Sequence, residues 1–115
     1  MKNPVLFLSF TILLAACGSN TPTGIADKFL ECLATKEYDR AMQYCTPGAA
    51  VVVNMARNMD TQPAQSGRYT VLRDSVIGDQ GWVFYTDTKL APGSEIKMQM
   101  AKVDGKWKVD ARMEK

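Results

Sequence analysis

The sequence predicts an α+β domain in which N-terminal helices pack on a curved, four-stranded antiparallel sheet. Between residues 21 and 59, apolar residues recur at helical spacing, and two Thr-Pro pairs stand where helices would begin. From residue 68 onward, runs of β-branched and aromatic residues alternate with turns that contain glycine. Helices followed by an antiparallel meander are typical of a domain whose helices cover one face of the sheet.

Three helices are expected in the first half of the chain. Thr21-Pro22 and Thr46-Pro47 each place a capping side chain before the residue best suited to the first helical position, and Thr35 is expected to cap a helix between them. The three stripes expected to face the core are Ile25, Phe29, Cys32 and Leu33, then Tyr38, Ala41, Met42 and Cys45, and finally Val51, Val52, Met55 and Met59. The valine triplet 51–53 also favours a strand, so the third segment has that alternative.

Two hairpins are expected after the polar loop 60–67. Residues 68–77 and 82–88 flank Gly78-Asp79-Gln80-Gly81, and a turn over these four residues pairs Asp74 with Tyr85 and Arg73 with Thr86. Residues 89–94, with Pro92-Gly93, make the next turn.

Asp104-Gly105 is the clearest structural signal, because this dipeptide favours a two-residue type I′ turn. The turn pairs Val103 with Lys106, Lys102 with Trp107, Met100 with Val109 and Met98 with Ala111. This register places most apolar residues of the hairpin on one face, and a one-residue slip would scramble both faces. Lys102 is the exception, and its ammonium is expected to lie over the Trp107 ring.

The N-terminal segment has the pattern of a secretory signal. Lys2 precedes an apolar run from residue 5 to residue 16, which is about a dozen residues, whereas a membrane-spanning helix needs roughly 20. Leu14-Ala15-Ala16-Cys17 resembles the lipobox of bacterial lipoproteins. By that resemblance, cleavage leaves Cys17 as the first residue, with a diacylglycerol thioether and an acylated amine. A signal with an incidental cysteine and a retained membrane helix are the alternatives.

The chain is therefore expected to divide into a signal peptide (1–16), a lipidated cysteine with a short tether (17–21) and one α+β domain (22–115). An aspartate after the lipidated cysteine favours inner-membrane retention in enterobacterial lipoproteins, and this chain has Gly18 instead. We therefore expect an outer-membrane anchor with the domain facing the periplasm. Without residues 1–16 the chain has 99 residues, and without Lys2 it has 13 basic and 12 acidic side chains, a balance that argues against nucleic acid as a partner.

Cys32 and Cys45 are the two cysteines that remain once Cys17 is lipidated. An even pair in an oxidising compartment favours a disulfide, which would close a loop of about 14 residues and stabilise the domain by about 3 kcal/mol. Two buried free thiols are the alternative. A metal site needs more ligands than two cysteines, and the chain has no histidine.

Three segments together carry a resemblance to a known family. They are Ala26-Asp27-Lys28-Phe29-Leu30, Lys36-Glu37-Tyr38-Asp39-Arg40-Ala41 and Val103-Asp104-Gly105-Lys106-Trp107-Lys108-Val109. In this order and spacing they resemble small bacterial lipoproteins of unknown function whose domain belongs to the nuclear transport factor 2-like, or cystatin-like, superfamily. The resemblance covers residues 22–112 and implies a curved sheet around a long helix with an apolar pocket between them. That superfamily includes isomerases, dehydratases and binding modules, so the fold does not decide the function.

No catalytic motif stands out in the sequence. The residues that could supply acid–base chemistry in the pocket are Tyr38, Tyr44, Tyr69, Tyr85, Asp74 and Asp87. The pairing of Asp74 with Tyr85 could make an acid–base pair, but an exposed cross-strand contact is the alternative that we favour. A small isomerase- or dehydratase-like enzyme is therefore the least favoured function.

We expect a non-catalytic protein without a cofactor, which binds the membrane through Cys17 and takes a small apolar ligand or an envelope protein into its pocket. The seven methionines suit adaptable binding surfaces or ordinary core filling. An envelope assembly or dimerisation module, including a homodimer, is the alternative. Exposed apolar residues on the outer sheet face would favour assembly, whereas a deep, enclosed cavity would favour a ligand.

Overall fold

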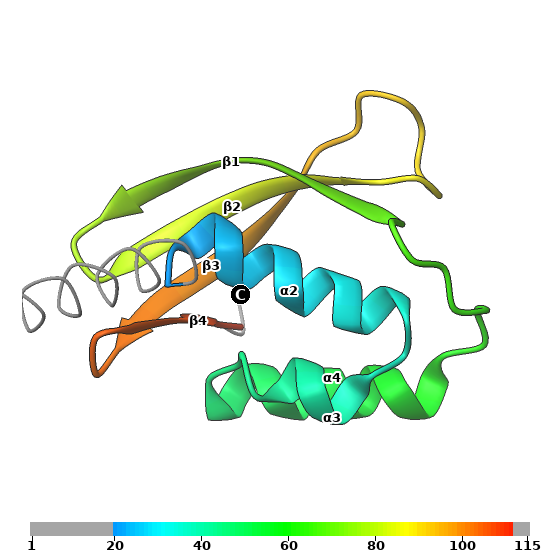
Figure 1. The fold of residues 1–115 in the computed structure, drawn as a ribbon, viewed down its shortest axis with the longest axis horizontal. Helices are drawn as coiled ribbons and strands as arrows, with labels where there is room; N and C mark the ends of the chain where they lie inside the picture. Colours follow the sequence, from blue (N-terminus) through cyan, green and yellow to red (C-terminus); the bar gives the residue numbers. More distant parts are fainter. Residues whose placement is uncertain (1–19, 112–115) are drawn as a thin grey trace, which may run out of the picture.

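The computed structural model describes residues 20–111, and these form helices and one antiparallel sheet (Figure 1). The elements are α2 (Pro22–Ala34), α3 (Tyr38–Met42), α4 (Pro47–Met59), β1 (Tyr69–Ile77), β2 (Gln80–Asp87), β3 (Ile96–Val103) and β4 (Lys106–Val109). The predicted α+β class is confirmed, with three helices packed against a four-stranded open sheet in the described part of the chain. Cys17 lies outside the described residues. Among residues 20–111, no helix is long and apolar enough to cross a bilayer.

The sheet is a meander in the order β1-β2-β3-β4, and each strand is antiparallel to its neighbour. Helix α2 lies along the inner face of the sheet, where it contacts β1, β2 and β4. Helices α3 and α4 lie on the side of α2 that is away from β1 (Figure 1), and α4 packs chiefly against α3. This arrangement leaves α4 beside the sheet rather than on it.

The core lies between α2 and the inner face of the sheet. Its largest fully buried side chains are Leu30, Val83 and Met100. The buried cluster comprises Ala26, Phe29, Leu30, Cys32, Ala41, Cys45, Ala49, Val53, Val83, Met100, Trp107 and Val109. Gly81 makes room for the indole of Trp107, because a Cβ at this position would lie 3.4 Å from the ring and 3.3 Å from the carbonyl oxygen of Ser75.

Two of the three predicted helix starts are confirmed by their caps. The hydroxyl of Thr21 accepts a hydrogen bond from the Gly24 N–H at 3.1 Å, and that of Thr46 accepts from the Ala49 N–H at 3.3 Å. The prediction for Thr35 is wrong. Its hydroxyl donates to the carbonyl oxygen of Glu31 at 2.9 Å and so closes the end of α2 instead of starting α3.

The turn of the first hairpin is shorter than the predicted four residues 78–81. Gly78 and Asp79 alone form the turn, because Ile77 pairs with Gln80 and the φ of +62° at Gly78 suits glycine. Asp74 therefore faces Val83, so the predicted pairing of Asp74 with Tyr85 is wrong. Arg73 likewise faces Phe84 and not Thr86.

Strand β1 also contains an irregularity that no sequence signal indicated. The register shifts between Val71 and Arg73, so that Leu72 bulges out of the ladder. Beyond the bulge, Val71 pairs with Tyr85. The strand is thus kinked near its middle.

The last hairpin follows the prediction up to the end of β4. Both turn residues have positive φ, 53° at Asp104 and 79° at Gly105, as a type I′ turn requires. The pairings of Val103, Lys102 and Met100 with Lys106, Trp107 and Val109 are confirmed, and the Lys102 nitrogen lies 5.9 Å from the centre of the Trp107 ring. The pairing of Met98 with Ala111 is not formed, because β4 ends at Val109.

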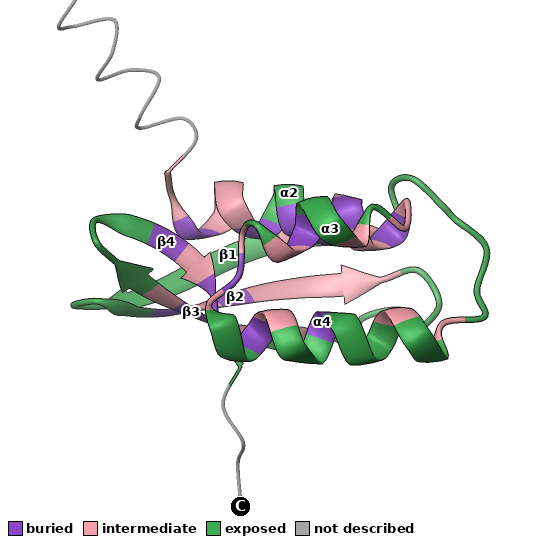
Figure 2. Ribbon diagram, turned by 90° about the horizontal axis from the view of Figure 1, so that it is seen from below, coloured by how far each residue is buried: buried purple, intermediate pink, exposed green. Residues whose placement is uncertain are grey.

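Helix α4 has the predicted bounds but faces the other way. The side expected to be buried is exposed, with exposed fractions of 60% at Val51, 57% at Met55 and 77% at Met59. Ala49 and Val53 are buried instead (Figure 2). Residues 49–53 are all apolar, so the helix offers two apolar sides, and the one with the small Ala49 packs closely against the rest of the core.

Candidate functional site

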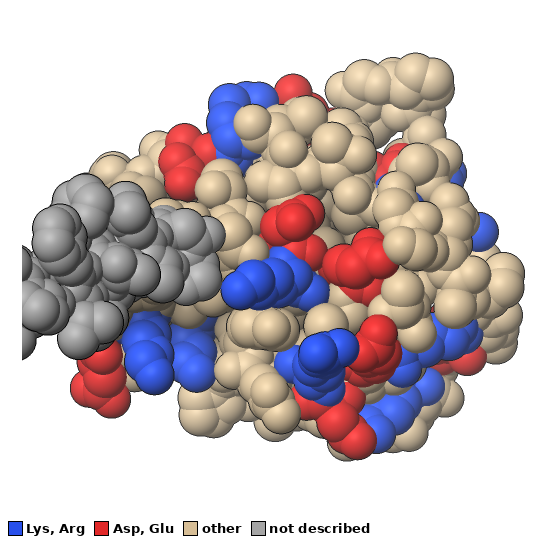
Figure 3. Space-filling view, viewed as in Figure 1, with Lys and Arg blue, Asp and Glu red and all other residues tan. Residues whose placement is uncertain are grey.

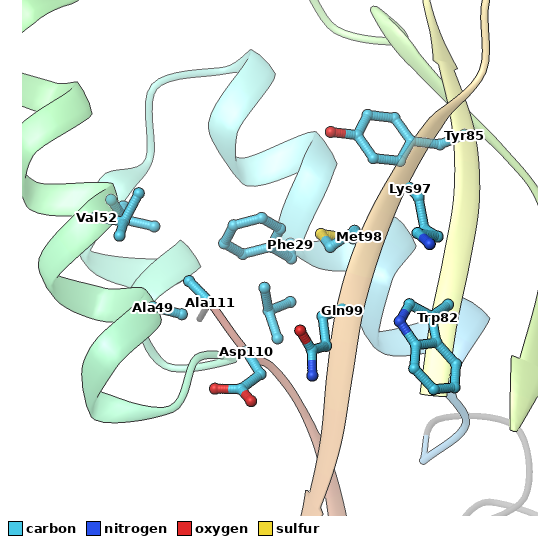
Figure 4. A pocket seen from close by; sticks show the side chains of 12 residues that line it. Phe29, Ala49, Val52, Trp82, Tyr85, Lys97, Met98, Gln99, Asp110 and Ala111 are labelled. Carbon is cyan, nitrogen blue, oxygen red and sulfur yellow. The ribbon is translucent and has the colours of Figure 1, made fainter. Parts of the chain in front are cut away.

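A groove of about 600 Å³ lies between α4 and the sheet, and we call it the α4 groove. Twelve residues line it (Figure 4): Phe29, Ala49, Val52, Val53, Trp82, Tyr85, Lys97, Met98, Gln99, Val109, Asp110 and Ala111. Phe29 lies between Val52 of α4 and Met98 of β3 (Figure 4). The α4 groove is open to solvent along its length, because α4 packs on α3 and stands beside the sheet.

The two walls of the α4 groove differ in chemistry. The helix wall is apolar, and it presents Ala49, Val52 and Val53. The sheet wall mixes the apolar Met98 with polar side chains, of which Lys97 is one. An apolar wall opposite a mixed wall suits a ligand that is apolar on one side and polar on the other.

The sheet wall is also the uncovered part of a strand edge. Strand β4 pairs with β3 from Met100 to Val103, and Asp110 extends this contact to Gln99, so within the described chain the stretch 96–98 has β2 on one side and no strand on the other. The Asp110 N–H donates to the carbonyl oxygen of Gln99 at 2.9 Å, which shows that the backbone groups of Gln99 point to this open edge. Since the direction of these groups alternates along a strand, the N–H and carbonyl of Lys97 point there too.

The polar groups at the base of the groove have internal partners. The hydroxyl of Thr46 donates to Oδ1 of Asp110 at 2.9 Å, and this contact ties the start of α4 to the chain after β4. The ring of Tyr85 packs edge to face on Tyr69, with centroids 5.8 Å apart. Burial raises the pKa of Tyr85, so its hydroxyl keeps its proton near neutral pH and can donate a hydrogen bond.

Tyr38 lies in a separate polar cluster at the far end of α4. Its hydroxyl donates to Asp60, and Lys36 forms an ion pair with the same carboxylate at 3.1 Å. Hydrogen bonds from Tyr38 and from the Gln62 N–H lower the pKa of Asp60 to about 2, whereas burial and Asp60 raise the pKa of Tyr38 to about 12. These opposite pKa shifts keep Tyr38 protonated and Asp60 ionised near neutral pH. The cluster therefore has a structural role, in which it joins the ends of the helices to the 60–67 loop.

Of the other predicted acid–base residues, Tyr69 packs on Tyr85 and pairs with Asp87 across the ladder, whereas Asp74 and Tyr44 lie elsewhere. Asp87 accepts two hydrogen bonds from the guanidinium of Arg68, both at 2.9 Å, and this pairing lowers its pKa. Asp74 lies exposed on β1, away from the Tyr85 hydroxyl that it was expected to pair with. Tyr44 lines a different hollow, near the N-terminus of the described chain. No acid–base pair is thus assembled from the predicted set.

Cys32 and Cys45 both lie in the core, as predicted, but Cys45 was expected on the second helix and instead follows the end of α3 at Met42, where it forms a parallel bridge with Val109. In the structure they are free thiols, which is the alternative to the predicted disulfide. The Cys45 thiol is within hydrogen-bonding distance of the Ala41 carbonyl oxygen, at 3.5 Å. Burial raises the pKa of Cys32 and raises that of Cys45 to about 11, so neither thiol is reactive at neutral pH.

Asn20 has a structural role that no local pattern indicates, because it was expected to belong to the short tether 17–21. Its side-chain amide donates to the carbonyl oxygen of Gly105 at 2.8 Å and accepts from the N–H of Trp107 at 3.0 Å. These two hydrogen bonds fix the start of the domain to the β3–β4 hairpin.

The described chain is thus an α+β domain with an open groove at a sheet edge. It contains no group of three or more cysteine, aspartate or glutamate side chains that could hold a metal ion. Comparison with models of known protein families, with curated proteins and with solved structures found no match.

Proposed function

We propose that this chain is a non-catalytic, lipid-anchored protein of the bacterial cell envelope, and that its α4 groove binds a segment of a partner protein. The observation that carries the binding proposal is the meeting of an apolar helix wall with an open strand edge. An open groove supports a protein partner over a small ligand, because a ligand site encloses most of its occupant.

The chemistry of the groove favours an extended segment that adds to β3 as a further strand. The open edge at 96–98 is about 10 Å long, which matches roughly three residues of a partner strand. Backbone groups of Lys97 would bond the partner, while alternate partner side chains would contact Val52 and Met98. Such an occupant would use both walls at once.

The anchor and the fold family complete the proposal. The lipobox-like Leu14-Ala15-Ala16-Cys17 supports lipidation at Cys17, and Gly18 supports an outer-membrane anchor with the domain facing the periplasm. The order of helices and meander supports membership of the nuclear transport factor 2-like, or cystatin-like, superfamily.

A small apolar ligand is the second candidate occupant. The volume of the α4 groove, about 600 Å³, falls within the range of roughly 300–1,000 Å³ that ligand pockets occupy. Binding of a small ligand needs the apolar wall but not the strand edge. A substitution that changes only the strand edge therefore distinguishes a small ligand from a partner strand.

The experiment is site-specific photo-crosslinking in the native host, with the crosslinking residue at Val52 and, as a control, at Val51, which is exposed on α4 but does not line the groove. We expect one protein adduct at Val52 and none at Val51. The substitution Lys97→Pro removes the N–H that strand addition needs, and Lys97→Ala keeps it. Loss of the adduct in Lys97→Pro alone supports strand addition.

Two results would contradict the proposal. An adduct that persists equally in both Lys97 variants would exclude strand addition at this edge. A crosslink to a small molecule instead of a protein would show that the α4 groove binds a small ligand. The anchor is tested separately by the intact mass of the protein from host membranes, and a mass without acyl chains would overturn it.

A further inference from the structure

A second hollow, of about 460 Å³, lies where the chain enters the domain, and we call it the lysine pocket. Its lining consists of Asn20, Ile25, Lys28, Gln43, Tyr44, Lys106, Trp107 and Lys108. Three lysines from two elements line it, Lys28 of α2 and Lys106 and Lys108 of β4, and the lining contains no carboxylate. On the face seen in Figure 3, blue side chains lie over both elements, with red side chains beside them over α2.

The charges of the lysine pocket are not neutralised within the described chain. None of the five ion pairs between described residues involves Lys28, Lys106 or Lys108. Lys108 donates a hydrogen bond to the carbonyl oxygen of Gln43 at 3.3 Å, which holds its ammonium at the rim of the pocket. The pocket therefore combines positive charge with the amide of Gln43 and with the one side-chain N–H of Asn20 that does not bond Gly105, a combination that suits a phosphate.

The position of the pocket relative to Cys17 restricts what can reach it. Asn20 lines the pocket and is fixed to the β3–β4 hairpin by its two hydrogen bonds. Only two residues, Gly18 and Ser19, separate it from Cys17, so the two Cα atoms are at most about 11 Å apart even when the chain is fully extended. An acylated Cys17 would thus hold the pocket within reach of the lipid headgroups.

The same end of the sheet exposes apolar side chains. Ile77 is 70% exposed and Val103 is 43% exposed, and Val103 pairs directly with Lys106. The Lys102 N–H donates to the Asp79 carbonyl oxygen at 2.8 Å, so the two hairpin turns lie side by side. Apolar side chains next to lysines are typical of surfaces that rest at a membrane interface.

We propose that the lysine pocket binds the phosphate headgroup of an anionic phospholipid in the membrane that holds Cys17. The inference rests on the proposed lipid anchor and adds an orientation to it, with the two hairpin turns against the bilayer. The anchor supplies a high local lipid concentration, so a pocket of modest affinity is occupied.

The experiment is lysine footprinting on the full mature protein, purified from membranes and placed in vesicles of phosphatidylcholine, with or without phosphatidylglycerol. A water-soluble acylating reagent labels exposed amines, and peptide mass spectrometry reads each lysine separately. We expect phosphatidylglycerol to slow labelling of Lys28, Lys106 and Lys108 by about fivefold, the factor that corresponds to one lysine at an anionic surface. Lys89 and Lys97, which lie at the other end of β2 and β3, should not change.

Matched double variants strengthen the test. The double variant Lys28→Gln/Lys106→Gln should abolish the protection of Lys108. The control double variant Lys89→Gln/Lys97→Gln removes the same amount of charge and should leave the protection of Lys108 intact. Equal labelling in both kinds of vesicle would overturn the inference. Protection by inorganic phosphate in neutral vesicles, equal to that by phosphatidylglycerol, would also overturn it, because the pocket would then take a free anion. The mass of the Cys17 peptide from the same sample reports acylation, so failure of the anchor is seen independently.

Discussion

Two adjacent valines on α4 offer a direct test of the groove. Val53 is 5% exposed and belongs to the core, whereas Val52 is 47% exposed and lines the α4 groove. The changes Val53→Ala and Val52→Ala remove the same atoms from the same helix. They therefore differ only in what surrounds the side chain.

The expected magnitudes follow from burial and helix propensity. Deleting two buried carbons of Val53 costs about 1.6 kcal/mol in transfer free energy, with a further cost for the cavity. Alanine is the better helix former by about 0.5 kcal/mol, and this gain applies at both positions. We expect Val53→Ala to lower the free energy of unfolding by about 1–2 kcal/mol and the melting temperature by about 5–10 °C, whereas Val52→Ala leaves stability unchanged or slightly raises it.

Urea unfolding followed by tryptophan fluorescence measures both changes, since Trp107 is buried in the core. Equal destabilisation by the two substitutions would refute the reasoning. Val52 would then be packed as tightly as Val53, and the helix wall of the α4 groove would not be open to a partner.

Three further predictions concern other parts of the molecule. Because burial raises the pKa of Cys32 and Cys45, we expect slow alkylation of both at pH 8 in the folded protein and rapid alkylation in urea without reductant; a requirement for reductant would establish the disulfide instead. The pKa of Asp60 falls from 3.8 to about 2 on folding, so its stabilisation is complete above 3.8 and is lost as the pH falls toward 2. Asp60→Asn should flatten acid unfolding in that range, and an unchanged profile would count against the shift. Asn20→Ala should speed hydrogen exchange of the Trp107 backbone amide about tenfold, because it removes a hydrogen bond worth about 1.4 kcal/mol. Exchange at the wild-type rate would show that the hydrogen bond between Asn20 and Trp107 does not form in solution.

Much of the fold could be predicted because its signals are local. A cap is decided by residues three apart, as at Thr21 and Thr46, and a type I′ turn is decided by two residues, as at Asp104-Gly105. Each of these signals is present in the sequence and needs no knowledge of the rest of the chain.

The candidate site could not be predicted, because it depends on tertiary choices. Helix α4 is apolar on two sides, and the side that packs is chosen by the shape of the neighbouring core, in which Ala49 permits a close approach. The register of the first hairpin depends on which residues of 78–81 make the turn, and more than one choice is compatible with the sequence. The hydrogen bonds of Asn20 join residues that are 85 and 87 positions apart, which no local pattern indicates.

The bulge at Leu72 affects how two copies of the chain can meet edge to edge. Strand β1 is nine residues long and forms one outer edge of the sheet, which is the kind of edge that joins copies into fibres. The break in its ladder twists the strand, and the nearby Arg73 forms an ion pair with Glu95 at 2.9 Å. A second copy therefore finds no straight edge there, so copies of this chain are discouraged from growing into a continuous sheet.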